Sequence, residues 1–250
     1  MEKSTTLGMT LGLFAVGYGM YLKGADPHAL INPAAFLIIF AGTFAALLNA
    51  FPMKDIKRFG KLLKIIFTGK KITSKQEILE LFVSLAKSAK SEGVMGIEKK
   101  ANEVEDPFIR STLILVADGF PADFIAETVE SEIKQMEERH RSGAAIFAQG
   151  GMYAPTLGVL GAVIGLIGGV KVYSIAAAFV ATLLGIFTGY VMWHPFANKL
   201  KRISAEEVEM KKMVLEGALA LQSGASSIAM EAKLQSFIPL SQRKSLRDEG

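Results

Sequence analysis

Hydrophobic residues along this chain gather in four long runs, and nearly all charged residues lie between them. None of the runs contains Asp, Glu, Lys or Arg, and they cover residues 5–22, 33–51, 148–167 and 172–193. About 18 apolar residues in a helix cross a hydrocarbon core of about 30 Å. The pattern therefore predicts an all-α membrane protein with four transmembrane helices. The first run lacks an extended basic stretch before it, so we expect a span and not a cleaved signal peptide.

The polar segment between the second and third runs carries the start signals of several helices. Ser74 and Glu77 match a capping box, and Asp106-Pro107 places proline at a first helical position. Pro121 begins a third helix, in which apolar residues recur at helical spacing, at Ile125, Val129, Ile133 and Met136. We expect this third helix to continue into the third span without a break.

Similar signals follow the fourth run. Ser204 and Glu207 predict the start of a new helix, Ser223-Gly224 predicts its end, and Pro239 ends the structured part. The predicted organisation has five parts: two spans in residues 1–53, a helical cytoplasmic domain in 54–147, two spans in 148–196, C-terminal helices in 197–240, and a flexible tail in 241–250.

Basic residues are concentrated directly after two of the runs. They are Lys54, Lys57, Arg58, Lys61 and Lys64 after the second, and Lys199, Lys201 and Arg202 after the fourth. Because cytoplasmic loops carry the excess of Lys and Arg in membrane proteins, we place both termini and the 54–147 segment in the cytoplasm. The formal net charge of +4 is then a topology signal. The basic residues are not interleaved with aromatic ones on one face, which argues against a nucleic-acid partner.

Small residues form stripes on the predicted spans. They are Gly8 and Gly12 in the first, Gly158, Gly161, Gly165 and Gly168 in the third, and Ala178, Thr182, Gly185 and Gly189 in the fourth. Such stripes let helix backbones approach closely in a membrane. Two interpretations stay open: tight packing within one subunit, or a smooth wall along which a neighbour moves.

The spans contain no carboxylate and no basic side chain. Their polar candidates are Thr10, Thr43, Asn49, Thr156, Thr182 and Thr188, and a lone threonine in a helix commonly bonds its own backbone. Because ion carriers mark their pathway with intramembrane carboxylates, a partner has to supply one if this chain conducts. Three histidines, no cysteine and no cluster of polar residues predict neither a catalytic site nor a metal or other cofactor.

Long motifs resemble one family over nearly the whole chain. "QGGMYAPTLGVLGAVIGLIGG" and "SIAAAFVATLLGIFTGYVMWHPFANKLKR" resemble the third and fourth membrane helices of the MotA family of flagellar stator subunits, and "INPAAFLIIFAGTFAALLNAFP" and "SLAKSAKSEGVMGIEKKANEVEDPFIR" extend the likeness. The resemblance implies a homopentamer in the bacterial inner membrane, around two copies of the single-span partner MotB. It further implies that an aspartate of MotB binds the ion, that the ring lies in membrane lipid, and that the cytoplasmic face of the ring turns the rotor protein FliG.

The same resemblance implies roles for particular residues. Pro155 and Pro195 match the prolines at the cytoplasmic end of the third helix and at the end of the fourth, where each can act as a hinge. Lys90 and Glu98 match a basic and an acidic position of the rotor interface, and Glu132 matches a further acidic one. The family usually has arginine where this chain has Lys90, and lysine lacks the bidentate fork of arginine.

Two positions bear on the transported ion. Sodium-driven relatives place a threonine hydroxyl where this chain has Ala162, whereas Thr182 matches the hydroxyl position of the fourth helix. A carboxylate takes up a proton without the shell of oxygen ligands that sodium needs. The resemblance therefore implies proton transport.

One feature departs from the family pattern. Only residues 168–171 join the third and fourth spans, where the family has a longer polar connection. A four-residue helix connection is possible, and an engineered deletion or an omitted loop stays an alternative. The rival functional interpretations are a membrane scaffold and the energising subunit of a related transport or gliding machine, and the identity of the partner separates them from a flagellar stator.

Overall fold

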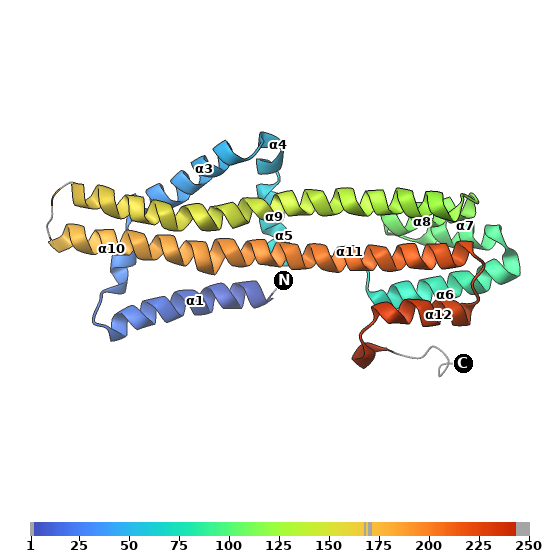
Figure 1. The fold of residues 1–250 in the computed structure, drawn as a ribbon. Helices are drawn as coiled ribbons and strands as arrows, with labels where there is room; N and C mark the ends of the chain where they lie inside the picture. Colours follow the sequence, from blue (N-terminus) through green and yellow to red (C-terminus); the bar gives the residue numbers. More distant parts are fainter. Residues whose placement is uncertain (1–2, 168, 170–171, 244–250) are drawn as a thin grey trace. The chain divides into compact units, whose positions relative to one another are not determined.

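The computed structural model describes residues 3–167, 169 and 172–243. In these ranges the chain forms helices and turns without a strand, as the sequence predicts (Figure 1). The helices group into two compact units. The first unit comprises residues 1–70 with 139–203, and the second comprises 71–138 with 204–250.

The first unit contains the apolar helices. They are α1 (Lys3–Leu22), η1 (Pro27–Leu30), α2 (Pro33–Phe36), η2 (Leu37–Ala41), α3 (Gly42–Ala50), α4 (Met53–Ile56), α5 (Phe59–Thr68), α10 (Val172–Phe187) and η3 (Thr188–Trp193). Two long helices, α9 (Ala122–Ile167) and α11 (His194–Gln222), contribute residues to both units. Segments η2 and η3 are π-helical.

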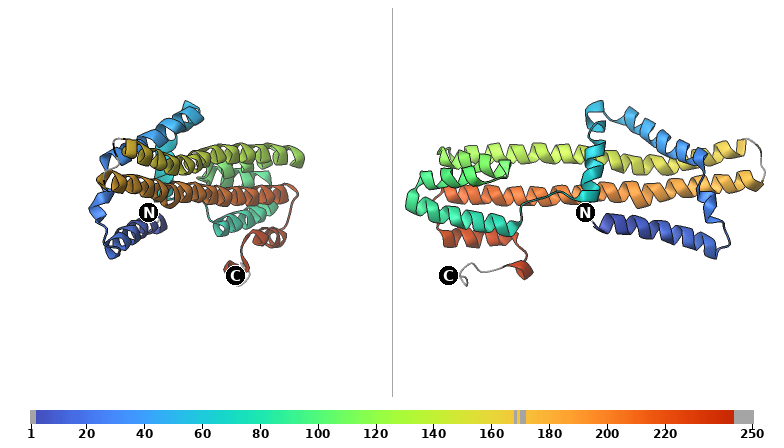
Figure 2. Two further views of the ribbon diagram at one scale, coloured as in Figure 1. Left: turned by 60° about the vertical axis from the view of Figure 1, so that its left-hand side comes forward. Right: turned by 180° about the vertical axis from the view of Figure 1, so that it is seen from behind.

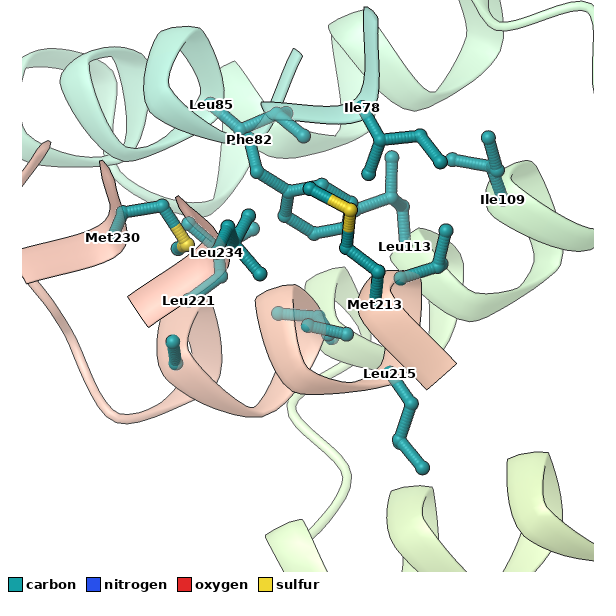
Figure 3. Packing of buried hydrophobic residues seen from close by; sticks show 14 of the residues in the cluster. Ile78, Phe82, Leu85, Ile109, Leu113, Met213, Leu215, Leu221, Met230 and Leu234 are labelled. Atoms are coloured by element: carbon teal, nitrogen blue, oxygen red, sulfur yellow. The ribbon is translucent and has the colours of Figure 1, made fainter. Parts of the chain in front are cut away.

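The second unit is built from shorter amphipathic helices around a separate core. They are α6 (Lys75–Glu92), α7 (Val94–Glu103), α8 (Pro107–Ala117), α12 (Ser227–Leu234), η4 (Gln235–Phe237) and η5 (Leu240–Gln242). Phe82 of α6 is fully buried in this core, between Leu113 of α8 and Met213 of α11 (Figure 3). Gly217 makes room for the ring, because a Cβ there would stand 2.7 Å from Phe82 Cδ1.

Three helical segments within the described ranges are long and apolar enough to cross a membrane. They are Pro27–Ala50, Ala122–Ile167 and Val172–Gln222. The predicted first span coincides with α1. Its four glycines and three threonines lower its mean hydropathy, and α1 is not among these three segments. The presence of apolar spans agrees with the expectation of a multi-pass membrane protein, and the count of four spans stays a prediction.

Several predicted helix starts are confirmed. Ser74 Oγ accepts from the Glu77 N–H at 3.2 Å while the Glu77 carboxylate accepts from the Ser74 N–H at 3.1 Å, which completes the capping box. Asp106 accepts from two N–H groups of the first turn of α8, with Pro107 at the first position. Helix α9 continues from Ala122 to Ile167, so the third helix of the polar segment does run into the third span.

Two expectations at the other end of the chain are wrong. Ser204 does not begin a helix, because it lies inside the continuous α11, and Pro195 does not end the helix of the fourth span, because it is the second residue of α11. Proline removes a backbone donor and crowds the preceding turn. The π-helical segment η3 comes directly before and accommodates this defect, so the helix continues.

The end of this long helix is confirmed. It stops at Gln222, and Gly224 adopts a φ of +74° that favours glycine. A short turn, η5, follows Pro239, so the structured part extends a few residues further than expected. Residues 244–250 of the predicted tail lie outside the described ranges, as do Gly168, Val170 and Lys171 of the short connection.

The two units do not divide where we place the membrane borders. Helix α5 and the turn of α9 just after residue 139 belong to the first unit because they pack on each other. Ser142 donates to the Asp55 carboxylate at 3.2 Å, and the rings of Phe59 and Phe147 stack with centroids 5.0 Å apart. The borders at residues 53, 147 and 196 mark where the predicted spans leave the membrane, whereas the two units are defined by which residues pack together. The borders stay predictions.

Candidate functional site

The third and fourth spans meet backbone to backbone. A Cβ on Gly158 of α9 would stand 2.8 Å from the Ala181 carbonyl oxygen and 2.9 Å from Gly185 Cα. A Cβ on Gly185 of α10 would stand 2.8 Å from both the Ala154 carbonyl oxygen and Gly158 Cα. Real side chains do not fit at such distances, so glycine is required on both helices. We call Gly158, Gly185 and Gly189 the glycine interface.

Gly189 extends this interface to the proline of the third span. A Cβ on Gly189 would stand 2.7 Å from Pro155 Cγ and 2.9 Å from the Gly151 carbonyl oxygen. Pro155 lies inside α9, and Gly189 lies in the π-helical η3. The two irregular stretches of backbone in neighbouring spans therefore face each other.

Two glycines that sequence reasoning missed continue the contact. A Cβ on Gly150 would overlap the Trp193 ring at 2.4 Å, and one on Gly151 would stand 2.8 Å from the His194 ring. The doublet before Met152 was visible in the sequence. The residues that contact this doublet could not be identified from the sequence, because they depend on how far the fourth span is shifted along the third.

The remaining glycines of the predicted stripe are less constrained. Gly161 has ordinary contacts, with Ala181 Cβ at 3.6 Å from an added Cβ, and Gly165 has open space around it. Packing within the subunit thus accounts for Gly158, Gly185 and Gly189. For Gly161 and Gly165, the interpretation as a wall along which a neighbour moves stays a prediction.

The hydroxyls of the spans mostly bond their own helices. Thr182 Oγ1 donates to the Ala178 carbonyl at 3.2 Å, and Thr188 Oγ1 donates to that of Leu184 at 2.8 Å. Thr43 differs, because its side chain is fully buried and its Oγ1 has no hydrogen-bond partner within the described part of the chain. Ala162 is half-buried one position beyond Gly161. The ion-path roles of Ala162 and Thr182 stay predictions.

Lys90 and Glu98 lie on two helices of the second unit that meet at one turn. Both side chains are exposed, Lys90 in the last turn of α6 and Glu98 in α7. Gly93, with a φ of +65°, makes the turn between them. Lys100 Nζ donates to the Ser84 carbonyl at 3.1 Å and to its hydroxyl, which fastens α7 onto α6. Sequence reasoning missed Lys100 because no spacing rule joins residues on different helices.

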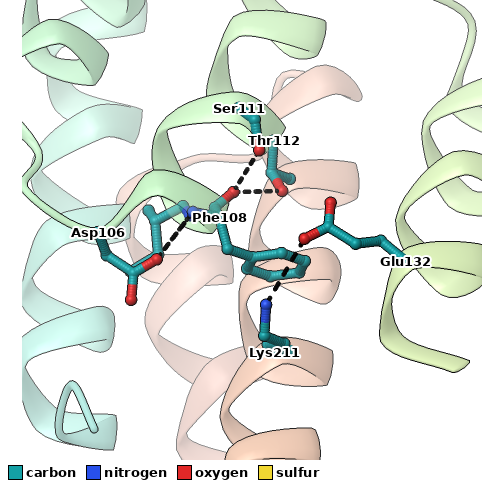
Figure 4. A network of polar contacts seen from close by, with 7 residues as sticks. Asp106, Phe108, Ser111, Thr112, Glu132 and Lys211 are labelled. Atoms are coloured by element: carbon teal, nitrogen blue, oxygen red, sulfur yellow. Dashed lines mark hydrogen bonds and ion pairs between the residues drawn. The ribbon is translucent and has the colours of Figure 1, made fainter. Parts of the chain in front are cut away.

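Glu132 has an internal partner. Its carboxylate pairs with the Lys211 ammonium at 3.7 Å (Figure 4). The side chain of Lys211 is only 9% exposed against 52% for Glu132. Lys211 Nζ also lies 3.4 Å from the centroid of the Phe108 ring, a cation–π contact. Glu132 thus helps to join α9 to α11, whose Lys211 also contacts α8 through Phe108. It is not only a surface charge.

Together these features define a class of protein: an all-α membrane protein with glycine-packed spans and a separate helical unit that presents charges. Two family models match the chain. They are "MotA/TolQ/ExbB proton channel family" over residues 100–213 and "Motility protein A N-terminal" over residues 6–93.

Curated relatives match from end to end. Motility protein A of Bacillus subtilis is 44% identical over 100% of this chain and 96% of its own length. Motility protein A of Helicobacter pylori is 31% identical over 100% of both. Chemotaxis protein PomA of Vibrio alginolyticus is 24% identical over 95% of this chain and 96% of its own. This chain belongs to the motility protein A family, within the MotA/TolQ/ExbB proton channel proteins.

Solved structures agree with this assignment. The flagellar MotAB stator complex from Bacillus subtilis matches with a TM-score of 0.92 and 45% identity, over 97% of this chain and 98% of that one. The MotAB structure from C. jejuni matches with a TM-score of 0.93 and 29% identity, over 98% and 100% of the two chains.

Proposed function

We propose that this chain is a flagellar motor stator subunit that forms an ion channel with MotB and converts ion flow into torque. The observation that carries the proposal is the likeness to stator structures over nearly the whole chain, at 45% identity to one of them. The helical unit that presents Lys90 and Glu98 fits the task of contacting a rotor.

The composition of the spans supports a division of labour with the partner. The four predicted spans hold no carboxylate, and the described threonines of the fourth span bond their own backbone. We therefore assign the ion-binding carboxylate to MotB, and to this chain the surrounding ring, a homopentamer as the resemblance implies. Ala162 favours protons as the ion. We propose no enzymatic activity and no cofactor.

The proposed location follows from the basic residues. Those that follow the second and fourth spans support a cytoplasmic location for the second unit and both termini. There the second unit meets FliG. The contact between Pro155 and Gly189 lies close to the predicted cytoplasmic ends of the two spans, and we propose it as their hinge.

Complementation tests the proposal. A motile bacterium that lacks its own stator genes should regain flagellar rotation when this chain is produced together with MotB. It should stay paralysed when the membrane aspartate of MotB is changed to asparagine. The same chain alone in liposomes should carry no proton current. Recovery of transport across the outer membrane without any rotation would instead indicate an energising subunit of a transport machine.

A further inference from the structure

An open cavity of about 590 Å³ lies in the first unit beside the first turns of α1. Helix α1 forms one side, and η3 with the beginning of α11 forms the other. The ribbon views show α1 beside α10 (Figure 1, Figure 2). The size is in the range of ligand sites. The glycine interface and the rotor-facing charges use none of this space.

One end of the cavity is polar and basic. The charged residues that line it are Lys199 and Arg202, and both are cations. Lys199 Nζ donates to the hydroxyls of Thr5 and Ser4, the latter at 3.4 Å, which holds the ammonium against the first turns of α1. Two cations at one end of a cavity are a recognition set for a phosphate group.

The polar end of the cavity lies next to an amphipathic helix, α5. Thr5 Oγ1 donates to the Ile66 carbonyl of α5 at 3.4 Å. Helix α5 buries Ile66 and exposes Lys61 and Lys64, the pattern of helices that lie in the headgroup layer of a membrane. The basic end of the cavity is therefore level with lipid headgroups.

An apolar groove continues from the other end. A second cavity of about 540 Å³ shares Tyr190 and Val191 with the first and extends along α10 to Phe179. From Arg202 to Tyr190 a helix rises about 18 Å at ~1.5 Å per residue, which already exceeds half of a hydrocarbon core of about 30 Å. The part of the second cavity beside Tyr190 and Val191 is therefore the part that an acyl chain of the same leaflet reaches.

We propose that these two cavities bind one anionic phospholipid of the inner leaflet, with its phosphate at Arg202 and Lys199. One acyl chain lies in the groove between α1 and α10. The proposal rests on the topology proposed above, which puts Arg202 on the cytoplasmic side. A free phosphate would need only the basic end, whereas the groove adds the apolar length that selects a lipid.

The first arm of the test changes charge. The complex with MotB is purified in detergent, and the phosphatidylglycerol that it retains is measured by native mass spectrometry. Arg202→Gln should lower the affinity for added phosphatidylglycerol about fivefold. Lys201→Gln is the matched control, because Lys201 is the exposed neighbour of Arg202 and does not line the cavity. Phosphatidylcholine should bind the native complex weakly.

The second arm changes space and leaves charge constant. Gly8 lines the cavity, and a Cβ there meets no atom within 4 Å, so Gly8→Leu introduces its side chain into the cavity from an open position. It should remove the retained lipid. Gly19→Leu on the same helix is the control, because Gly19 also has open space and lines neither cavity.

The outcomes separate the occupants. Loss of lipid in the Arg202 and Gly8 variants alone supports the proposal. Equal retention in all four variants, or equal loss in all four, overturns it, and so does a structure of the complex in which a neighbouring subunit fills the cavity. Binding of inorganic phosphate as tight as that of lipid overturns the lipid assignment. The motility assay tests the stator function separately, so the two proposals fail independently.

Discussion

Pro155 Cγ and Gly189 meet so closely that a Cβ on the glycine would stand 2.7 Å from the ring carbon. Proline deprives α9 of one backbone hydrogen bond, and the π-helical η3 has widened turns at the facing position. Two weakened stretches of helix thus support each other. This contact is where we expect the paired spans to bend.

Filling the glycine interface should destabilise the complex. Gly189→Ala places a methyl group against the Pro155 ring, and overpacking of this kind costs about 1–3 kcal/mol. The midpoint of thermal unfolding of the purified complex should fall. Gly165→Ala on the same pair of spans meets open space, and should leave the midpoint unchanged or slightly raise it. Equal effects of the two changes would mean that the interface is not tightly packed.

The ion can be tested in swimming cells. Because Ala162 offers no hydroxyl ligand, flagellar rotation should persist when sodium is replaced by potassium and should stop when a protonophore is added. Rotation speed in tethered cells is the measurement. A motor that halts in sodium-free medium while the proton gradient is intact would refute the inference from Ala162.

The sequence predicted the features that depend on neighbours along the chain, and it failed where contacts join distant segments. The cap at Ser74, the start at Asp106 and the break at Gly224 follow from local chemistry, and all are present. Ser204 shows the limit. Ser-x-x-Glu also occurs inside a helix, and only the unbroken course of α11 from His194 to Gln222 shows that Ser204 is such a case.

The candidate sites divide in the same way. The small-residue stripes were visible as periodic glycines, because a helix repeats every 3.6 residues. That Gly150 lies against Trp193, or that Lys211 lies beside Glu132, depends on the shift and rotation of one helix against another. A single sequence contains no spacing rule for such pairs.

The two partners in the Lys211–Glu132 pair should behave differently. Lys211→Ala removes a buried side chain over the Phe108 ring, and we expect a loss of about 2–4 kcal/mol in unfolding free energy, as for other large-to-small changes at buried sites. Glu132→Gln changes a half-exposed group and should cost at most about 1 kcal/mol. Thermal unfolding of the complex measures both.

Motility then decides the second role of Glu132. If Glu132 contacts the rotor, Glu132→Gln should slow rotation although stability is nearly unchanged. Glu138→Gln, another exposed acid on α9, is the control. Normal rotation with Glu132→Gln would leave the residue with its structural role alone.

Reversal of the exposed charges tests the rotor face. Lys90 and Glu98 are exposed on α6 and α7, away from the spans in sequence, so Lys90→Glu with Glu98→Lys should leave assembly and membrane insertion intact. Exposed ion pairs contribute only about 0.2–1 kcal/mol each. Each single reversal should therefore reduce torque up to about fivefold, and the double reversal should reduce it further.

Rescue identifies the contact. Opposite charge reversals on FliG should restore torque to the double variant, because like charges would again become opposite ones. Lys134→Glu, which alters an exposed lysine on α9, should need no compensation. Torque is measured from the speed of a bead on a tethered flagellum, and assembly from the amount of complex in the membrane. A double variant that swims normally, or one that is absent from the membrane, would show that these two side chains are not the rotor contact.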